Sequence, residues 1–185
     1  EKSNQKNLGV IKSSNLCTEI IEYSNDEETA VCNLASIGLS KYVNDDKTFN
    51  YEHLHSVTKV VTSNLNKIID VNFYPTEKTR RSNLLHRPIG IGVQGLADVF
   101  AMMDIPYHSA EAINVNKLIF ETIYHAALER SNEIAISRKD AMTAVISMDK
   151  YDREIVNKVK PIRAELDITD KNVIGSYSSF VGSPA

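Results

Sequence analysis

The sequence has no excess of either charge and no long hydrophobic run. Its 185 residues include 21 basic and 24 acidic side chains, for a formal net charge of −3. This balance lacks the basic surface that nucleic acid or an anionic membrane would require. No apolar stretch approaches the roughly 20 residues that cross a bilayer, and the polar residues 1–5 are unlike a signal peptide. These absences predict a cytoplasmic protein with no nucleic-acid or membrane partner.

Cysteine is scarce as well, since the chain has only Cys17 and Cys32. In a reducing compartment two thiols are more often free or redox-active than joined in a structural disulfide. The commonest fate of a free cysteine is burial as a small hydrophobic residue, so the two thiols alone favour a structural role. If the chain forms a hairpin centred near Ser24-Asn25, the thiols fall opposite each other, whereas another turn centre separates them.

An initiator methionine is missing too, and residues 181–185 resemble the middle of a loop. We therefore expect an internal piece of a longer protein, which can hold chemistry that it does not complete. A hydrophobic content of 42% and a charged content of 24% are those of a globular protein.

Hydrophobic spacing predicts a mixed α/β structure that is rich in helix. Two segments read as extended, residues 16–23 and 29–38. Helices are expected over residues 51–70, 89–103 and 109–138, and the polar run 76–83 after Pro75 should close the first of these helices. Residues 139–172 carry interspersed charges of both signs and predict exposed helices, which form a solvated face or a partner surface.

The first extended segment places chemically active side chains on one face. Side chains alternate along a strand, so Asn15, Cys17 and Glu19 should point the same way, and Leu16 should pack on the other face. A thiol beside a hydrogen-bonding group and a base can act as a nucleophile or a radical centre. A cysteine protease would need a histidine as base, and none lies near Cys17 in the sequence.

Two other patterns predict no site. Gly90–Gly95 spells G-x-G-x-x-G, but the polar segment before it is not a buried strand, so we interpret the glycines as a place of close helix packing rather than a nucleotide site. His53 and His55 diverge by about 200° on a helix. We expect His86, His108 and His125 to have no acidic or cysteine partner at ligand spacing. We therefore predict no metal site in this chain.

Several blocks resemble the large subunit of class I ribonucleotide reductases. The first block is Ser13-Ser14-Asn15-Leu16-Cys17-Thr18-Glu19-Ile20, which is similar to the finger-loop motif of that family. Further blocks follow in the same order, at residues 30–36, 64–70, 86–98, 119–124 and 182–184. Residues 138–172 do not share the resemblance and look like an insertion.

The resemblance implies a role for each residue of the motif. Cys17 would become the transient thiyl radical that takes the 3′ hydrogen of the ribose, and Glu19 would accept the proton of the 3′-hydroxyl. Asn15 would bond the ribose hydroxyls, and Leu16 would line the same substrate site. Cys32 would be one of two reducing thiols that end as a disulfide, with its partner outside this chain.

For the fold, the resemblance implies a fragment of a ten-stranded α/β barrel with the radical cysteine on a finger loop. Residues 1–137 would belong to the catalytic barrel, 138–172 would form a charged helical insertion, and 173–185 would return to a barrel loop. The implied reaction is the reduction of ribonucleoside diphosphates to deoxyribonucleoside diphosphates for DNA replication. We expect the piece to be inactive alone.

The resemblance also implies partners and cofactors. They are a radical-generating small subunit of the metal-tyrosyl type, a second large subunit and a thioredoxin- or glutaredoxin-type reductant. Allosteric ATP and deoxynucleotide sites would lie elsewhere in the full-length protein, and this chain itself would hold no cofactor. Two alternatives remain open: a cobalamin-dependent reductase with the same N-x-C-x-E pattern, or a non-catalytic helical interaction module.

Overall fold

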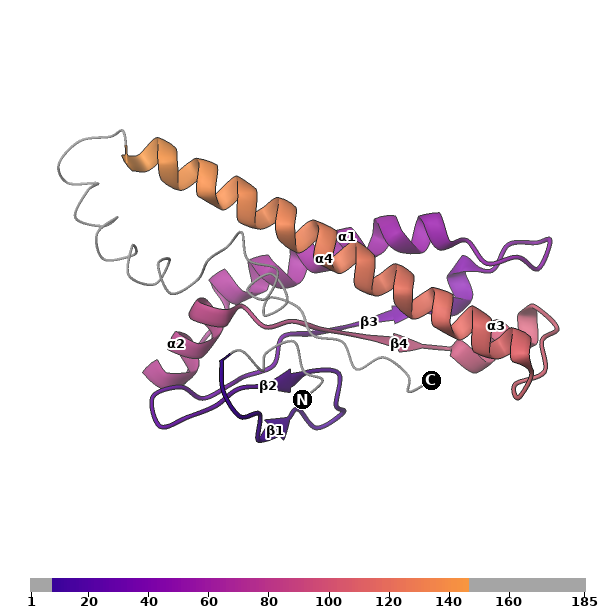
Figure 1. The fold of residues 1–185 in the computed structure, drawn as a ribbon, viewed down its shortest axis with the longest axis horizontal. Coiled ribbons are helices and arrows are strands. Elements are labelled where there is room, and N and C mark those ends of the chain that lie inside the picture. The colour runs from indigo at the N-terminus through magenta and orange to yellow at the C-terminus, as the bar shows by residue number, and fades with distance from the viewer. Residues whose placement is uncertain (1–7, 147–185) are drawn as a thin grey trace.

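A computed structural model describes residues 8–146, with side chains as far as residue 139. This part of the chain combines short strands with helices of very different length (Figure 1). In order they are β1 (Ser13–Ser14), β2 (Ile21–Glu22), β3 (Leu34–Gly38), the 3-10 helix η1 (Leu39–Tyr42), α1 (Tyr51–Val71), α2 (Glu77–His86), β4 (Gly90–Gln94), α3 (Leu96–Met102) and α4 (Ala110–Ile146). The expectation of a helix-rich α/β structure is confirmed for these residues.

The strands form two separate pairs. β1 and β2 are antiparallel, with Ser13 opposite Glu22. β3 and β4 are parallel and in register from Leu34 opposite Gly90 to Gly38 opposite Gln94. A parallel pair needs a long crossover connection, and here α1 and α2 lie within that connection. Figure 1 shows α1 and α4 on one side of the β3–β4 pair and the β1–β2 hairpin on the other.

Helix α1 confirms the expected helix over residues 51–70 almost to the residue. Its start is fixed by Asn50, whose side-chain oxygen accepts a hydrogen bond from the backbone N–H of His53 at 2.9 Å. Its buried face packs against α4, where Ala126 and Ala127 are fully buried. The core that forms around this contact includes Leu54, Leu65, Ile69, Ile119 and Ile123.

Two expectations about local structure were wrong. Residues 90–94 form a strand and not the start of a helix, because Ile89, Ile91 and Val93 alternate with glycine and glutamine in the period-two pattern of a strand. Helix α2 was missed because its segment is polar. It is set by a capping box, in which the hydroxyl of Thr76 accepts from the N–H of Thr79 and Thr79 bonds back to the N–H of Thr76.

Helix α4 runs on to Ile146, beyond the expected end at about residue 138. The boundary expected at residue 137 therefore falls inside a continuous helix. The rest of the charged segment, and the return to a barrel loop at residues 173–185, lie outside the described residues, so the division into domains stays a prediction.

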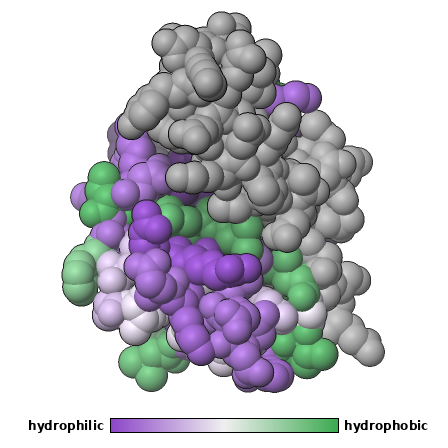
Figure 2. Space-filling view, turned by 90° about the vertical axis from the view of Figure 1, so that its left-hand side faces the viewer, coloured by the Kyte–Doolittle hydropathy of each residue, from purple (hydrophilic) through white to green (hydrophobic). Residues whose placement is uncertain are grey.

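None of the described helices is long and apolar enough to cross a membrane. Seen from the end where α2 lies, the described surface is largely hydrophilic, with hydrophobic side chains in separate patches (Figure 2).

Arg87 connects the ends of three elements. It follows α2 in the left-handed conformation, with φ of 50°, and its side chain is only 5% exposed. The guanidinium donates to the side-chain oxygen of Asn66 at 2.8 Å, to the backbone oxygen of Asn66 at 2.6 Å and to the carboxylate of Asp70 at 2.7 Å. The end of α2 and the approach to β4 are thereby held against the last turns of α1.

We expect Arg87→Ala to lower the free energy of unfolding by roughly 2–4 kcal/mol, because it removes three charge-assisted hydrogen bonds from a buried position. Denaturant unfolding of the purified protein measures this loss. Arg80→Ala is the control, since Arg80 is exposed on the same helix and such changes stay within about 0.5 kcal/mol. Equal effects of the two substitutions would contradict the role given to Arg87.

Candidate functional site

The residues of the N-x-C-x-E motif form a tight turn between β1 and β2. The N–H of Asn15 donates to the carbonyl of Ile20 at 3.2 Å, and the N–H of Thr18 donates to the carbonyl of Asn15 at 3.3 Å. Thr18 has φ of 65°, which a β-branched residue rarely adopts. The expected extended segment over residues 16–23 is therefore wrong for residues 16–20, and strand alternation does not place the motif side chains.

The turn nevertheless brings the amide and the carboxylate of the motif together. The side-chain N–H of Asn15 donates to Oε2 of Glu19 at 2.5 Å, and its side-chain oxygen accepts from the N–H of Ile20 at 3.1 Å. Ile20 is fully buried and anchors the turn. Cys17 is exposed, and Leu16 is 99% exposed instead of packed as expected. The motif thus presents an exposed thiol in the same turn as an amide–carboxylate pair.

Two glycines of β4 form the surface on which this turn lies. A Cβ atom at Gly92 would stand 3.1 Å from Cγ of Glu19. A Cβ atom at Gly90 would stand 3.1 Å from Cβ of Ile20 and 3.2 Å from the backbone oxygen of Glu19. The G-x-G-x-x-G pattern therefore serves close packing, but what it accommodates is the motif turn and not a helix. Gly95 meets a different need, since it starts α3 with φ of 77°.

The two cysteines do not face each other across a hairpin centred on Ser24-Asn25. The side chain of Asn25 instead accepts from the N–H groups of Glu27 and Glu28, both at 2.8 Å, which makes a local turn. β2 pairs backward with β1, while the strand after Cys32 pairs with β4. Both thiols are free and exposed.

The Cys32 thiol lies in the negative field of two carboxylates. Burial raises the pKa of Glu22 to about 7, and Oε1 of Glu22 has no hydrogen-bond partner among the described residues. The pKa of Cys32 is raised by partial burial first and then by the negative charge of Glu22, with smaller contributions from Glu19 and Cys17. Cys32 therefore lies within electrostatic range of the motif turn and stays a protonated thiol near neutral pH.

A buried amide network, which sequence reasoning missed, fixes the backbone beside Cys32. Asn33 is 3% exposed and donates to the carbonyl of Pro88 at 2.9 Å, while its own carbonyl accepts from the N–H of Gly90 at 2.9 Å. Asn83 donates to the side-chain oxygen of Asn33 at 3.2 Å. The one signal in the sequence was an amide inside an otherwise apolar extended segment.

The histidines also have partners that the sequence analysis did not find. His86 is buried and bonds the buried carboxylate of Glu28, which is 58 positions away in the sequence. His55 and His125 meet across α1 and α4 beside Glu129, the one group among the described side chains that could hold a metal ion. His125 and Glu129 are four positions apart on one helix, a ligand spacing that the sequence already displayed.

Known proteins supply an independent comparison. The family model described as ribonucleotide reductase, barrel domain, matches residues 1–167. A ribonucleoside-diphosphate reductase large subunit of Caenorhabditis elegans is 66% identical over 134 residues, which cover 72% of this chain and 17% of the relative. A large chain of Schizosaccharomyces pombe is 63% identical over 134 residues, again 72% of this chain and 16% of the relative.

A third relative extends the match. A large subunit of Plasmodium falciparum is 51% identical over 166 residues, which cover 85% of this chain and 21% of that protein. The chain thus spans between about a sixth and a fifth of the length of these relatives. The match of the family model runs through residue 167, into the charged segment that we expected to be an insertion.

The electrostatic link between Glu22 and Cys32 can be tested by alkylation. Above pH 7 the carboxylate of Glu22 is mostly ionised and opposes ionisation of the Cys32 thiol. Glu22→Gln should lower the pKa of Cys32 and speed its reaction with iodoacetamide at pH 8, because the thiolate is the reactive form. Mass spectrometry of the peptide that carries Cys32 measures the rate. Glu27→Gln, an exposed neighbour, should leave the rate unchanged, and a slower reaction of the Glu22 variant would refute the link.

Proposed function

This chain belongs to the ribonucleotide reductase barrel-domain family, and we propose that it carries the substrate-reducing centre of a class I ribonucleoside-diphosphate reductase large subunit. The observation that carries the proposal is the motif turn, where the exposed thiol of Cys17 stands in the same turn as the hydrogen-bonded pair of Asn15 and Glu19. The full protein would reduce ribonucleoside diphosphates to deoxyribonucleoside diphosphates.

In the proposed reaction, a thiyl radical on Cys17 takes the hydrogen atom from C3′ of the ribose. Glu19 accepts the proton of the 3′-hydroxyl, which eases departure of the 2′-hydroxyl as water. The Asn15 side chain, held at 2.5 Å from Glu19, can exchange that partner for the ribose hydroxyls. A base within hydrogen-bond reach of the reacting hydroxyl is the geometric requirement for such proton transfer.

Reducing equivalents come from two thiols. Cys32 and a second cysteine outside this chain give up two electrons and two protons and become a disulfide, while the hydroxyl leaves as water. Cys17 returns a hydrogen atom to C3′ and is regenerated as the thiyl radical. The elevated pKa of Cys32 keeps its proton available for this step. Because each turnover ends with a disulfide, an external dithiol of the thioredoxin or glutaredoxin type must reduce it.

The wider assembly follows from the same proposal. The motif turn would stand on the finger loop of a closed ten-stranded barrel, of which the β3–β4 pair would be one part. The radical would be generated in a small subunit that carries a metal-tyrosyl centre, and two large subunits would pair. Location in the cytoplasm, where substrate and reductant occur, is part of the proposal. The relatives are named ribonucleoside-diphosphate reductase large subunits or chains, which does not favour a cobalamin-dependent reductase or a non-catalytic interaction module.

We expect Cys17→Ser in the full-length protein to abolish deoxynucleotide formation while the thermal midpoint falls by no more than a few degrees. The thiol is exposed, so its loss removes little packing. Turnover is measured with the small subunit and reductant present, and unfolding is followed by circular dichroism. Retained product formation would refute the radical role, and a large loss of stability would favour a packing role instead.

The glycine surface under the turn gives a second test. Gly92→Ala places a methyl group 3.1 Å from Cγ of Glu19, so the carboxylate must shift by a few tenths of an ångström. We expect kcat to fall about 10- to 100-fold, because small displacements of a catalytic group cost rates of this size. The matched control is Gly38→Ala on β3, where a Cβ meets nothing within 4 Å. Equal kcat values for the two variants would contradict the proposed seating of Glu19.

A further inference from the structure

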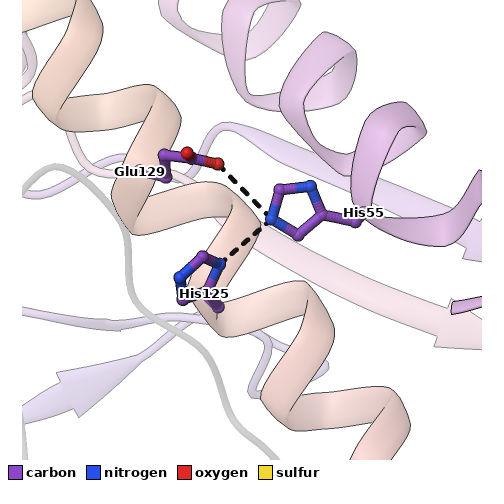
Figure 3. Close-up of side chains that lie close together, drawn as sticks. All are labelled: His55, His125 and Glu129. Atoms are coloured by element: carbon purple, nitrogen blue, oxygen red, sulfur yellow. Dashed lines mark hydrogen bonds and ion pairs between the residues drawn. The ribbon is translucent and has the colours of Figure 1, made fainter. Parts of the chain in front are cut away.

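Helices α1 and α4 meet through a polar cluster at the edge of their apolar contact. His55 projects from α1, and His125 and Glu129 project toward it from α4 (Figure 3). The two α4 residues are four positions apart and share one face of the helix. All three side chains are partly or largely exposed, so a dissolved ion can reach them in the described part of the chain.

The spacing of the three side chains matches a set of metal ligands. Nε2 of His55 lies 3.0 Å from Nδ1 of His125 and 3.4 Å from Oε2 of Glu129. One ligand atom from each residue lies within 4.8 Å of the other two. Zinc bonds of about 2.0–2.2 Å in tetrahedral geometry hold their ligand atoms roughly 3.3–3.5 Å apart. Little movement is therefore needed to place one ion among the three atoms.

We propose that His55, His125 and Glu129 bind a divalent transition-metal ion of the zinc class, which links α1 to α4. Two imidazole nitrogens with one carboxylate oxygen suit zinc, whereas calcium and magnesium prefer sites made of oxygen atoms. The fourth ligand is water, because the cluster borders an open hollow that is also lined by Glu52 and Glu121. These two carboxylates add negative potential, which favours a cation.

One neighbouring cation competes with the ion. Lys59 Nζ lies 3.2 Å from Oε2 of Glu129 and 2.5 Å from Oε1 of Glu133. When Glu129 turns to the metal, Lys59 keeps its bond to Glu133, so no charge is left unpaired. The positive charge of Lys59 nevertheless weakens metal binding, and Lys59→Gln is expected to strengthen it.

The site is separate from the motif turn. The ligands project from α1 and α4, on the opposite side of the β3–β4 pair from the β1–β2 hairpin (Figure 1). The ion therefore acts on the stability of the helix pair and takes no part in the proposed reaction. An ion that binds only the folded state raises stability with its concentration, so zinc should raise the thermal midpoint of the protein.

The test uses the full-length protein after removal of metals with a chelator. Co²⁺ is titrated as a spectroscopic probe of tetrahedral sites, Zn²⁺ is then added to displace it, and thermal midpoints are measured with and without Zn²⁺. His55→Ala, His125→Ala and Glu129→Gln should each lower the affinity at this site by at least about 10-fold, since even the loss of an outer partner costs that much. They should also remove the stabilisation by Zn²⁺. His108→Ala, an exposed histidine outside the cluster, should match the wild type.

The outcomes distinguish metal binding at this cluster from metal binding by other thiols or histidines of the protein. A Co²⁺ signal and a Zn²⁺-dependent midpoint that are identical in the wild type and all three ligand variants would overturn the proposal. The absence of saturable metal binding to the wild type would also overturn the proposal. The contact between His55 and His125 would then be a hydrogen bond only. Turnover without added zinc is measured in parallel, so failure of the metal site cannot be mistaken for failure of the reductase function.

Discussion

Parallel pairing of β3 with β4 is the constraint on which the rest of the described structure depends. Strands that run the same way cannot be joined by a short turn, so the chain must travel through α1 and α2 before it returns. Helix α1, which lies in this connection, has an apolar face, and α4 packs against that face. It also places Gly90 and Gly92 of β4 where the turn of Asn15–Glu19 can approach them. The long-range register therefore positions the local motif.

The motif turn combines a tightly packed backbone with an accessible thiol. A buried Ile20 and two glycines fix the backbone, while the thiol of Cys17 is exposed and the side chains of Asn15 and Glu19 are partly buried. Thr18 holds a left-handed conformation that costs roughly 1–2 kcal/mol. Strain of this kind persists where surrounding contacts determine the backbone, and it gathers at functional turns. A turn whose backbone is fixed by packing and whose thiol is accessible is suited to chemistry rather than to packing alone.

The sequence predicted the elements whose signals are local. The helices expected over residues 51–70 and 109–138 begin close to where α1 and α4 begin, and the motif residues were identified as a group. The failures had more than one cause. β4 was taken for a helix although its period-two pattern stands in the sequence, and the segment that packs against its glycines, at Glu19 and Ile20, is distant in the sequence. Helix α2 was missed because its stability comes from a capping box and from Arg87, not from an apolar stripe. His55 was set aside because its partners, His125 and Glu129, lie on another helix, whereas the four-residue spacing of His125 and Glu129 was overlooked.

Arg87 connects helix α1 to the strand on which the motif turn lies. A chain of hydrogen bonds runs from Asp70 and Asn66 on α1 through Arg87, and one residue later the carbonyl of Pro88 is held by Asn33. Asn33 in turn accepts from Gly90, on which the motif turn lies. No flexible linker interrupts this path. This series of hydrogen bonds therefore fixes β4, and with it the surface under Glu19, relative to α1.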